Sequence, residues 1–473
     1  MRNRGNRTDR TNKTNRTNRS RNRTDRSGER PRSYRLKNGV RIITSPVKGT
    51  DTATVLVMVG TGSRYESREI NGISHFLEHL FFKGTRRRPN ALALTSELDS
   101  LGAEYNAFTG KEYTGYWIKV AAEKIGRATE IVSDMLINPL FPPAEIEREK
   151  GVIIEELNMY RDNPMFYIED IFEELLYGDT PAGWDTIGTR ENILRFKRPD
   201  LVEYLEAQYG AGNIFVCLAG KVKKGKGEIQ RSGNVGQYIV SRYFGGRKLA
   251  ARGEKFKEKE KVVEKQARPA VKIHYKKTDQ AHLSLGVRAF GYGHPDKLAL
   301  KLLAVILGGS MSSRMFISLR ERAGLAYYVR TETEIYSDSG YLTTRAGVPV
   351  DKIEQAIKII LAEYRRVKKE LVPAGELRRA KDMLAGRMLI QLEASDAQAN
   401  WYGRQAVMAA TVERETGQAP AILTPSEYLA RIKRVTARDL RRVAEEIFSN
   451  RALNLAVIGP YREKKRFLDL LSV

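Results

Sequence analysis

The stretch Asn71 to Thr85, NGISHFLEHLFFKGT, constrains this chain more than any other part of its sequence. Its apolar residues recur at near-helical spacing, which predicts a helix. On this helix His75 and His79 are four residues apart on one face, with Glu78 beside them. Two imidazoles at this spacing can bind one metal ion. The order HxxEH is the inverted form of a zinc motif in which a glutamate acts as general base. The alternative is a helix whose histidines are only packed or solvated.

A catalytic zinc ion generally has three protein ligands, so the two histidines require a carboxylate from elsewhere in the chain. The best candidate segment runs from Ala144 to Tyr160. Its Glu149 and Glu156 are seven residues apart and therefore share one face of a predicted helix, whereas Glu155 is expected to point away from that face. Glutamates of charged helices commonly face solvent, and from the residues alone that interpretation stays open for both.

The motif and Glu156, which follows after 76 intervening residues, resemble the inverted zinc motif of the pitrilysin/insulinase family of metallopeptidases. The form is most similar to short-chain members, the mitochondrial processing peptidase and its bacterial and archaeal relatives. Three further stretches match the same pattern: NAFTGKEYTGYW (106–117), DTIGTRENI (185–193) and LGGSMSSRMFISLRERAGLAYYV (307–329). The resemblance covers about residues 34–473, with less match between about 221 and 270.

This resemblance implies a role for each residue of the motif. It makes His75, His79 and Glu156 the ligands of one Zn²⁺ per chain, Glu78 the general base, and Glu149 a second acidic residue that supports the site. The implied activity is that of a zinc-dependent metalloendopeptidase, in which zinc lowers the pKa of a water molecule and Glu78 takes its proton. Some family members are noncatalytic or partner-dependent subunits, which is the alternative.

The resemblance also implies two segments that bind peptide substrates. The first is an edge strand near the zinc ion, whose free backbone groups would pair with an extended peptide; from the sequence alone, an ordinary internal hairpin is about as good an interpretation. The second is an arginine and a tyrosine, seven residues apart, that contact the substrate and stabilise the tetrahedral intermediate. Tyr328 is a competing candidate for that tyrosine. The residues concerned are Asn106, Ala107, Phe108 and Thr109 in the strand, and Arg320 and Tyr327 in the pair.

The second half of the chain repeats the organisation of the first. A predicted strand over 281–290 precedes a predicted helix over 295–307, which has LAVIL in place of HFLEH and so has no metal-binding side chain. We therefore expect an α+β fold of two homologous halves, each a sheet covered by helices, with a catalytic half over 34–220 and a degenerate half over 269–473. The resemblance implies that the halves close like a clamshell around extended or unfolded peptides.

The net charge of +25 is concentrated in two segments that are poor in apolar pattern. Residues 1–33 form an Arg/Asn/Thr-rich tail that cannot bury enough apolar surface to fold, so we expect it to be disordered. Residues 221–268 are expected to form an extended basic linker. Neither segment interleaves basic residues with aromatic residues convincingly, which argues against a specific nucleic-acid site. Nonspecific contact of the tail with polyanions is the remaining alternative.

Cysteine content and hydropathy set further expectations. The only cysteine, Cys217, cannot form an intramolecular disulfide. No run of about 18 apolar residues is present, so no membrane span is expected. The tail lacks the apolar core of a signal peptide, which favours a cytoplasmic protein. Short-chain family members usually pair, so a homodimer or a heterodimer with a related subunit is expected; the presence of both the zinc motif and the Arg/Tyr pair in one chain favours the homodimer.

Overall fold

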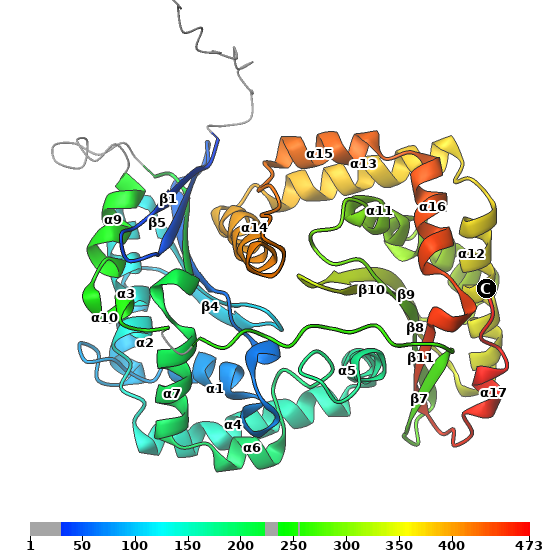
Figure 1. The fold of residues 1–473 in the computed structure, drawn as a ribbon, viewed down its shortest axis with the longest axis horizontal. Helices are drawn as coiled ribbons and strands as arrows, with labels where there is room; N and C mark the ends of the chain where they lie inside the picture. Colours follow the sequence, from blue (N-terminus) through cyan, green and yellow to red (C-terminus); the bar gives the residue numbers. More distant parts are fainter. Residues whose placement is uncertain (1–29, 223–234, 254–255) are drawn as a thin grey trace, which may run out of the picture.

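The computed structural model describes residues 30–222, 235–253 and 256–473, which form two α+β halves that face one another (Figure 1). The first half contains strands β1 (Arg32–Arg35), β2 (Arg41–Pro46), β3 (Thr52–Val59), β4 (Glu104–Thr109), β5 (Thr114–Ala121) and β6 (Ile214–Gly220). Its helices are α1 (Ile73–Leu80), α2 (Ala91–Ser100), α3 (Ile125–Ile137), α4 (Pro143–Asp162), α5 (Pro164–Tyr177), α6 (Arg190–Arg195) and α7 (Arg198–Gln208), followed by α9 (Val235–Phe244) and α10 (Arg247–Ala250).

The second half contains strands β7 (Ala270–Tyr275), β8 (Gln280–Ala289), β9 (Tyr328–Ile335), β10 (Gly340–Pro349) and β11 (Leu453–Gly459). Its helices are α11 (Lys297–Gly308), the π-helix η5 (Phe316–Arg322), α12 (Ile353–Lys369), α13 (Ala374–Gln391), α14 (Ser395–Thr416), α15 (Pro425–Arg434), α16 (Ala437–Ile447) and α17 (Lys465–Leu468).

The two sheets have the same strand order. The first is β1-β2-β6-β3-β5-β4 and the second is β7-β11-β8-β10-β9, so the second sheet matches the first without β1. In each sheet one pair is parallel, β2 with β6 and β7 with β11, and the other pairs are antiparallel. The predicted fold class, two related halves each built on a sheet with helices, is confirmed.

The central strands are buried on both faces because helices cover each sheet on both sides. In strand β3 (TATVLVMV), successive side chains point to opposite faces of the sheet, and both faces are buried. Val55 and Val57 belong to a core shared with helices of the first half, whereas Leu56 and Met58 belong to a second core with residues of α14. A continuous apolar run of this kind is typical of a strand covered on both sides.

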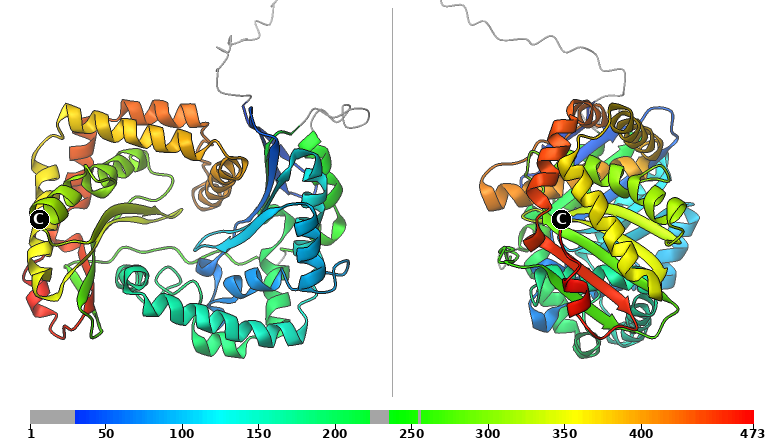
Figure 2. Two further views of the ribbon diagram at one scale, coloured as in Figure 1. Left: turned by 180° about the vertical axis from the view of Figure 1, so that it is seen from behind. Right: turned by 90° about the vertical axis from the view of Figure 1, so that its right-hand side faces the viewer.

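The face of each sheet that points toward the other half is covered by a helix from that other half. Helix α14 of the second half packs on β3 and β6 of the first sheet, and α5 of the first half packs on β8 and β11 of the second sheet. Figure 1 shows α14 between the halves, and Figure 2 shows from behind that α5 (teal) lies beside the second sheet. The halves are therefore interlocked by two exchanged helices, which a division at residues 34–220 and 269–473 does not represent.

The prediction of an extended linker over 221–268 is wrong for its middle part, where α9 and α10 form. Val240, Phe244 and Leu249 are buried in the core of the first half. Val240 and Phe244 are four residues apart, so they lie on one helical face that packs on α3. Among the described residues of this segment, 256–269 run between the halves without a helix or strand (Figure 1).

A basic run like the one in this crossing segment is expected to be solvated along its whole length. In the structure one of its lysines is buried. The side chain of Lys259 is 1% exposed, and its Nζ lies 2.7 Å from Glu415, 3.0 Å from Asp338 and 3.5 Å from Glu112. Arg64 contacts two of these carboxylates, at 2.7 Å from Glu112 and 2.8 Å from Asp338. The two cations and three carboxylates join both halves and the crossing segment in one buried network.

The predicted disordered tail falls mostly on residues 1–29, which lie outside the described residues. Arg32 and Ser33, placed in the tail by the prediction, belong to β1 and pair with β2. Among the described residues, no helix has both the length and the hydrophobicity needed to cross a bilayer.

Candidate metal centre

Helix α1 begins at a turn that requires a glycine. Gly72 has a φ of 100°, and a Cβ at this position would lie 2.4 Å from the carbonyl oxygen of Ile187. The buried carboxylate of Glu66 accepts hydrogen bonds from the backbone N–H groups of Gly72 and Ser74, both at 2.8 Å. An anion at this end also interacts favourably with the helix dipole. These contacts fix the first turn of α1, from which His75 projects.

The segment DTIGTRENI holds the same end of α1. The side-chain amide of Asn71 donates to the carbonyl oxygen of Asp185 at 3.0 Å, and that of Asn192 donates to the carbonyl oxygen of Asn71 at 3.1 Å. Gly188 has a φ of 91°, and a Cβ there would lie 2.4 Å from the carbonyl oxygen of Asn71. This stretch was matched to the family by resemblance, but its structural role was not anticipated.

The structure brings His75, His79 and Glu156 together. Nε2 of His75 lies 3.6 Å and Nε2 of His79 lies 3.3 Å from Oε2 of Glu156. One potential ligand atom from each residue lies within 4.8 Å of the others. The histidines come from α1 and the glutamate from α4, two helices that pack against each other.

These distances fit a zinc ion. Zinc bonds to histidine nitrogen and carboxylate oxygen are about 2.0–2.2 Å, so ligand atoms around a tetrahedral ion are separated by roughly 3.3–3.6 Å. The Glu156 oxygen meets this spacing to both histidines without any movement of the backbone. His75 is 8% exposed, whereas His79 and Glu156 are only partly buried, which leaves the position accessible from one side.

Glu149 contacts a candidate ligand rather than the candidate metal position. Its Oε2 lies 3.1 Å from Nδ1 of His79, and its Oε1 lies 2.5 Å from Nζ of Lys83. A carboxylate at Nδ1 favours the tautomer that leaves Nε2 free for a metal, an arrangement common among metal-binding histidines. Lys83 was missed by the sequence analysis, although its position four residues after His79 could have indicated it. Nδ1 of His75 is buried without a hydrogen-bond partner among the described residues.

Two of the three candidate ligands have charges that suit a cation, whereas His79 is protonated at pH 7 and would release a proton on binding one. Burial, together with the neighbouring His79, lowers the pKa of His75 to about 4, which keeps this imidazole neutral at pH 7. Burial opposes protonation of His79, but its hydrogen bonds to Glu149 and Glu156 raise its pKa to about 9. The hydrogen bond to His79 lowers the pKa of Glu156, so this carboxylate is ionised.

Glu78 lies on the same turn of α1 and is partly buried. Burial raises the pKa of this carboxyl group, although Thr109 opposes the shift by donating a hydrogen bond from Oγ1 to Oε2 at 2.5 Å. Thr109 was predicted to bind substrate through the strand edge, and the structure shows its side chain in contact with the predicted general base. Strand β4 is therefore tied to α1 at the candidate site.

Strand β4 lies at the edge of the first sheet and, among the described residues, pairs only with β5. β4 and β5 do form a hairpin, but it lies at the edge of the sheet, whereas the alternative interpretation required it to lie inside. Asn106 is exposed and its Oδ1 accepts a hydrogen bond from the N–H of Ala107 at 2.8 Å. Ala107 and Phe108 are partly buried and pack on opposite cores of the sheet.

Arg320 and Tyr327 lie together but make no direct contact with the candidate metal centre. Nη1 of Arg320 donates to the carbonyl oxygen of Tyr327 at 2.8 Å, and the Tyr327 side chain is exposed. The competing Tyr328 is partly buried, with its hydroxyl group 2.9 Å from Nδ1 of His282. Of the two tyrosines, Tyr327 is the one whose side chain is available. No hydrogen bond or ion pair within the described residues links the pair to His75, Glu78 or Glu156.

Comparison with protein families places this geometry in context. Residues 41–190 match the model described as insulinase (peptidase family M16), and residues 195–384 match the model described as the peptidase M16 inactive domain. The second match agrees with the absence of metal-binding side chains in the LAVIL segment of α11.

Individual relatives agree with the family models. The uncharacterised zinc protease YmxG of Bacillus subtilis is 32% identical over 416 residues, covering 84% of this chain and 97% of the relative. An uncharacterised zinc protease of Rickettsia felis is 31% identical over 435 residues, covering 90% of this chain and 97% of the relative.

Among solved structures, a protease from Helicobacter pylori has a TM-score of 0.78 at 22% identity, covering 91% of this chain and 99% of that one. A peptidase M16 inactive domain from Pseudomonas fluorescens has a TM-score of 0.78 at 17% identity, covering 92% and 98%. The chain therefore belongs to the insulinase family of peptidases, family M16.

Proposed function

We propose that this protein is a zinc metalloendopeptidase that hydrolyses peptide bonds in extended or unfolded peptides. The observation that carries the proposal is the preformed cluster of His75, His79 and Glu156, with the partly desolvated carboxyl group of Glu78 on the same turn of α1. The names of the relatives, which include several zinc proteases, support the same activity.

The residues of the cluster divide the work between them. His75, His79 and Glu156 would hold one Zn²⁺, which, when bound, supplies a Lewis acid that makes water more acidic and polarises a carbonyl group. Glu78 accepts the proton of the attacking water and returns it to the leaving amine, a role that suits a carboxyl group whose pKa is raised by burial. Glu149 is a positioning residue, since it acts through His79.

For the substrate, we propose that the free edge of β4, Asn106 to Thr109, pairs with the backbone of an extended peptide. Arg320 and Tyr327 would contact the same peptide from the second half, with the guanidinium and phenol donating to the oxyanion. Support for this role comes from the exposed side chain of Tyr327 and from the hydrogen bond that holds Arg320 beside it.

A noncatalytic subunit is the second candidate, and the intact ligand set argues against it. Since the ligand set and the Arg/Tyr pair are both present in one chain, the proposal is that the protein is active without a related subunit, as a homodimer. A cytoplasmic location stays a prediction.

The proposal is tested by measuring the zinc content of the purified full chain and its cleavage of unstructured fluorogenic peptides, beside Glu78→Gln. We expect stoichiometric zinc in both proteins, chelator-sensitive cleavage in the wild type, and a loss of cleavage of about 10²–10⁴-fold in the variant, the range for general bases. Retained cleavage by Glu78→Gln would refute the assignment of the base. A well-folded chain that binds no zinc would refute the proposed activity.

A further inference from the structure

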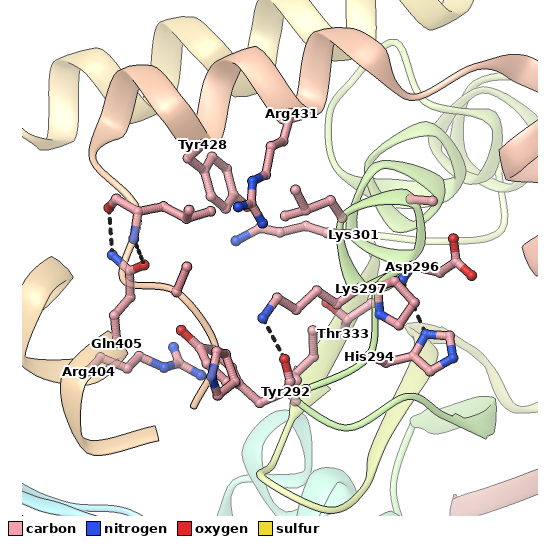
Figure 3. A pocket seen from close by; sticks show the side chains of 18 of the residues that line it. Tyr292, His294, Asp296, Lys297, Lys301, Thr333, Arg404, Gln405, Tyr428 and Arg431 are labelled. Atoms are coloured by element: carbon pink, nitrogen blue, oxygen red, sulfur yellow. Dashed lines mark hydrogen bonds between the residues drawn. The ribbon is translucent and has the colours of Figure 1, made fainter. Parts of the chain in front are cut away.

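A cavity lies in the second half of the molecule, apart from the candidate metal centre in the first half. It has a volume of about 1000 Å³ and is bounded by α11, α14, α15 and the last residues of β9 (Figure 3). None of the candidate zinc ligands lines it. Cavities of roughly 300–1,000 Å³ are the size of small-molecule and short-peptide sites.

The charged side chains that line this cavity are mostly cations, and they come from three helices. Two lysines lie on α11, one arginine on α14 and two arginines on α15: Lys297, Lys301, Arg404, Arg431 and Arg434. Three carboxylates also line it: Asp296, Glu334 and Asp439.

The three carboxylates already have partners. Asp296 receives two hydrogen bonds from Arg442, at 2.6 and 2.8 Å, and Asp439 caps α16 by accepting from the backbone N–H of Thr436 at 2.8 Å. Glu334 lies 3.4 Å from Arg404. These carboxylates therefore leave most of the positive charge in the cavity without a counter-charge.

Four of the five cations form no ion pair with a carboxylate among the described residues: Lys297, Lys301, Arg431 and Arg434. Lys301 and Arg431 form no ion pair or hydrogen bond there, and the Nζ of Lys301 lies 6.0 Å from the centre of the Tyr428 ring. Figure 3 shows the side chains of Lys301 and Arg431 directed into the same cavity. Desolvation in the cavity and the like charge of Arg404 lower the pKa of Lys301, so an anion bound near it would offset an unfavourable interaction.

Lys297 extends the positive region toward the other end of the cavity. Its Nζ lies 3.8 Å from the centre of the Tyr292 ring and donates to the carbonyl oxygen of Tyr292, but it contacts no carboxylate among the described residues. Burial and the charge of Arg431 lower the pKa of Lys297 to about 8. The position thus disfavours positive charge as the structure stands, and a bound anion would offset this.

Part of the cavity wall is aromatic, and ring packing and hydrogen bonds fix its side chains. Trp401 and Tyr428 pack edge to face with ring centres 5.1 Å apart. Nε1 of Trp401 donates to the carbonyl oxygen of Leu423 at 3.0 Å, and Gln405 makes hydrogen bonds of 3.0 and 2.8 Å to the same residue. A fixed aromatic wall beside uncompensated cations suits a ligand that has both an apolar part and an anionic group.

Strand β9 connects the proposed substrate-binding residue Tyr327 to the cavity. β9 is an edge strand that begins directly after Tyr327, and its residues Thr333, Glu334 and Ile335 line the cavity. At about 3.3 Å per residue, the strand covers roughly 20 Å between Tyr327 and Thr333. An extended peptide of about six residues could therefore reach from one end of this strand to the other.

We propose that this cavity binds the carboxylate group of a peptide, either a free C-terminus or an acidic side chain, between Lys301, Arg431 and Lys297. The cavity would then retain the anionic end of a substrate or product peptide. The peptide nature of the ligand rests on the proposed function, whereas the preference for a carboxylate rests on the charges and geometry of the cavity.

The test measures peptide binding by isothermal titration calorimetry to the full chain carrying Glu78→Gln, which prevents turnover. Three unstructured peptides share one apolar sequence and differ in charge: a free C-terminus, an amidated C-terminus, and an amidated C-terminus with one internal glutamate. We expect at least one of the two carboxylate-bearing peptides to bind about tenfold or more tightly than the neutral amide, the factor that one charge-assisted hydrogen bond contributes. Which of the two binds more tightly identifies the source of the carboxylate.

Matched variants locate the binding. Lys301→Met and Arg431→Met each remove one cation from the cavity, and Lys358→Met makes the same change at an exposed position of α12. The advantage of the carboxylate peptides should fall about tenfold in each cavity variant and persist in the control. Equal binding of the charged and neutral peptides, or equal loss in Lys358→Met, would overturn the inference. Because Lys301 and Arg431 are both exposed, neither substitution should prevent folding, and each variant gives an independent result.

The two proposals can fail separately. Carboxylate-dependent binding without cleavage of any peptide by the zinc-loaded wild type would refute the peptidase and leave the cavity as a carboxylate site. Cleavage without any carboxylate-dependent binding would refute the cavity site alone.

Discussion

Helices α1 and α11 follow corresponding strands in the two sheets, yet they present different side chains. In α1 the segment HFLEH places two imidazoles and a carboxyl group beside α4. In α11 the corresponding LAVIL segment is almost wholly buried in the core of the second half. The same architecture therefore holds a candidate metal centre in one half, whereas the corresponding segment of the other half only packs, so the scaffold does not determine the chemistry.

The halves also differ in where their charged groups gather. In the first half, carboxylates of α4 face the histidines of α1, whereas in the second half the cations of α11, α14 and α15 face a cavity. We therefore propose that one half binds a metal cation and the other an anion. The predictions below test this contrast and the contacts that join the halves.

The largest effect is expected from removing the carboxylate that α4 supplies to the metal centre. Glu156→Gln should lose zinc, and cleavage should fall by on the order of 10³-fold or more, since the metal contributes several kcal/mol to transition-state stabilisation. Zinc content after gel filtration and peptide cleavage measure the two effects. Glu155→Gln, at an exposed neighbouring position of the same helix, should keep both. A zinc-replete Glu156→Gln protein would show that the third ligand lies elsewhere.

The next largest effect is expected in the buried network between the halves. Among the described residues, Lys259→Met leaves Glu415 without an ion pair and leaves Glu112 and Asp338 with Arg64. Breaking a buried ion pair costs about 3–5 kcal/mol of unfolding free energy. Denaturant unfolding followed by tryptophan fluorescence measures the loss. Lys257→Met, at an exposed position two residues earlier, should change it by less than about 0.5 kcal/mol. Equal stability of the two variants would mean that Lys259 does not hold the halves together.

A smaller effect is expected from the residue that positions His79. Glu149→Gln should weaken zinc binding by about 10–100-fold, the range for partners of metal-binding histidines, while leaving all three ligands in place. Competition with a chromogenic chelator measures the affinity. Glu147→Gln changes an exposed glutamate of the same helix and should bind zinc like the wild type. If Glu149→Gln also did so, Glu149 would have no role in the site beyond its contact with Lys83.

The smallest effect is expected from acid. Burial opposes ionisation of Asp338, but hydrogen bonds and charge from Arg64, together with Lys259, hold its pKa well below the usual range in the folded state. A depressed folded-state pKa stabilises the fold above the unfolded pKa of about 3.9, and this stabilisation is lost as the pH falls below it. Between pH 5 and pH 3 this group should therefore account for a loss of about 1 kcal/mol in unfolding free energy. Asp338→Asn should show a shallower fall over the same range; identical slopes would contradict the assignment.

The sequence indicated those features of the fold that depend on local spacing. The HxxEH order and the seven-residue interval from Glu149 to Glu156 are properties of single helices, so the structure places these side chains on the expected faces. The strand predicted over 281–290 and the helix predicted over 295–307 follow from the same kind of pattern, and β8 and α11 form there. The catalytic roles of the HxxEH residues, Glu149 and Glu156 stay predictions, because no metal or substrate has been tested.

Other features depend on contacts between distant segments, which periodicity does not specify. An apolar face shows that a helix packs on something, but not that α5 packs on the second sheet and α14 on the first. Lys259 looked solvated because its neighbours in sequence are charged, whereas its burial depends on Glu112, Asp338 and Glu415 from elsewhere in the chain. The contact between Thr109 and Glu78 likewise requires the sheet edge to meet α1.

The exchange of α5 and α14 has a consequence for how the chain can be divided. A fragment that ends after β6 would keep α5 but lose the helix that covers its own sheet, and the complementary fragment would keep α14 but lose its own cover. Each fragment would expose an apolar sheet face and an apolar helix face that fit the other fragment. Produced separately, the fragments should aggregate, whereas produced together they should reassemble, so the folding unit of this protein is the whole pair of halves.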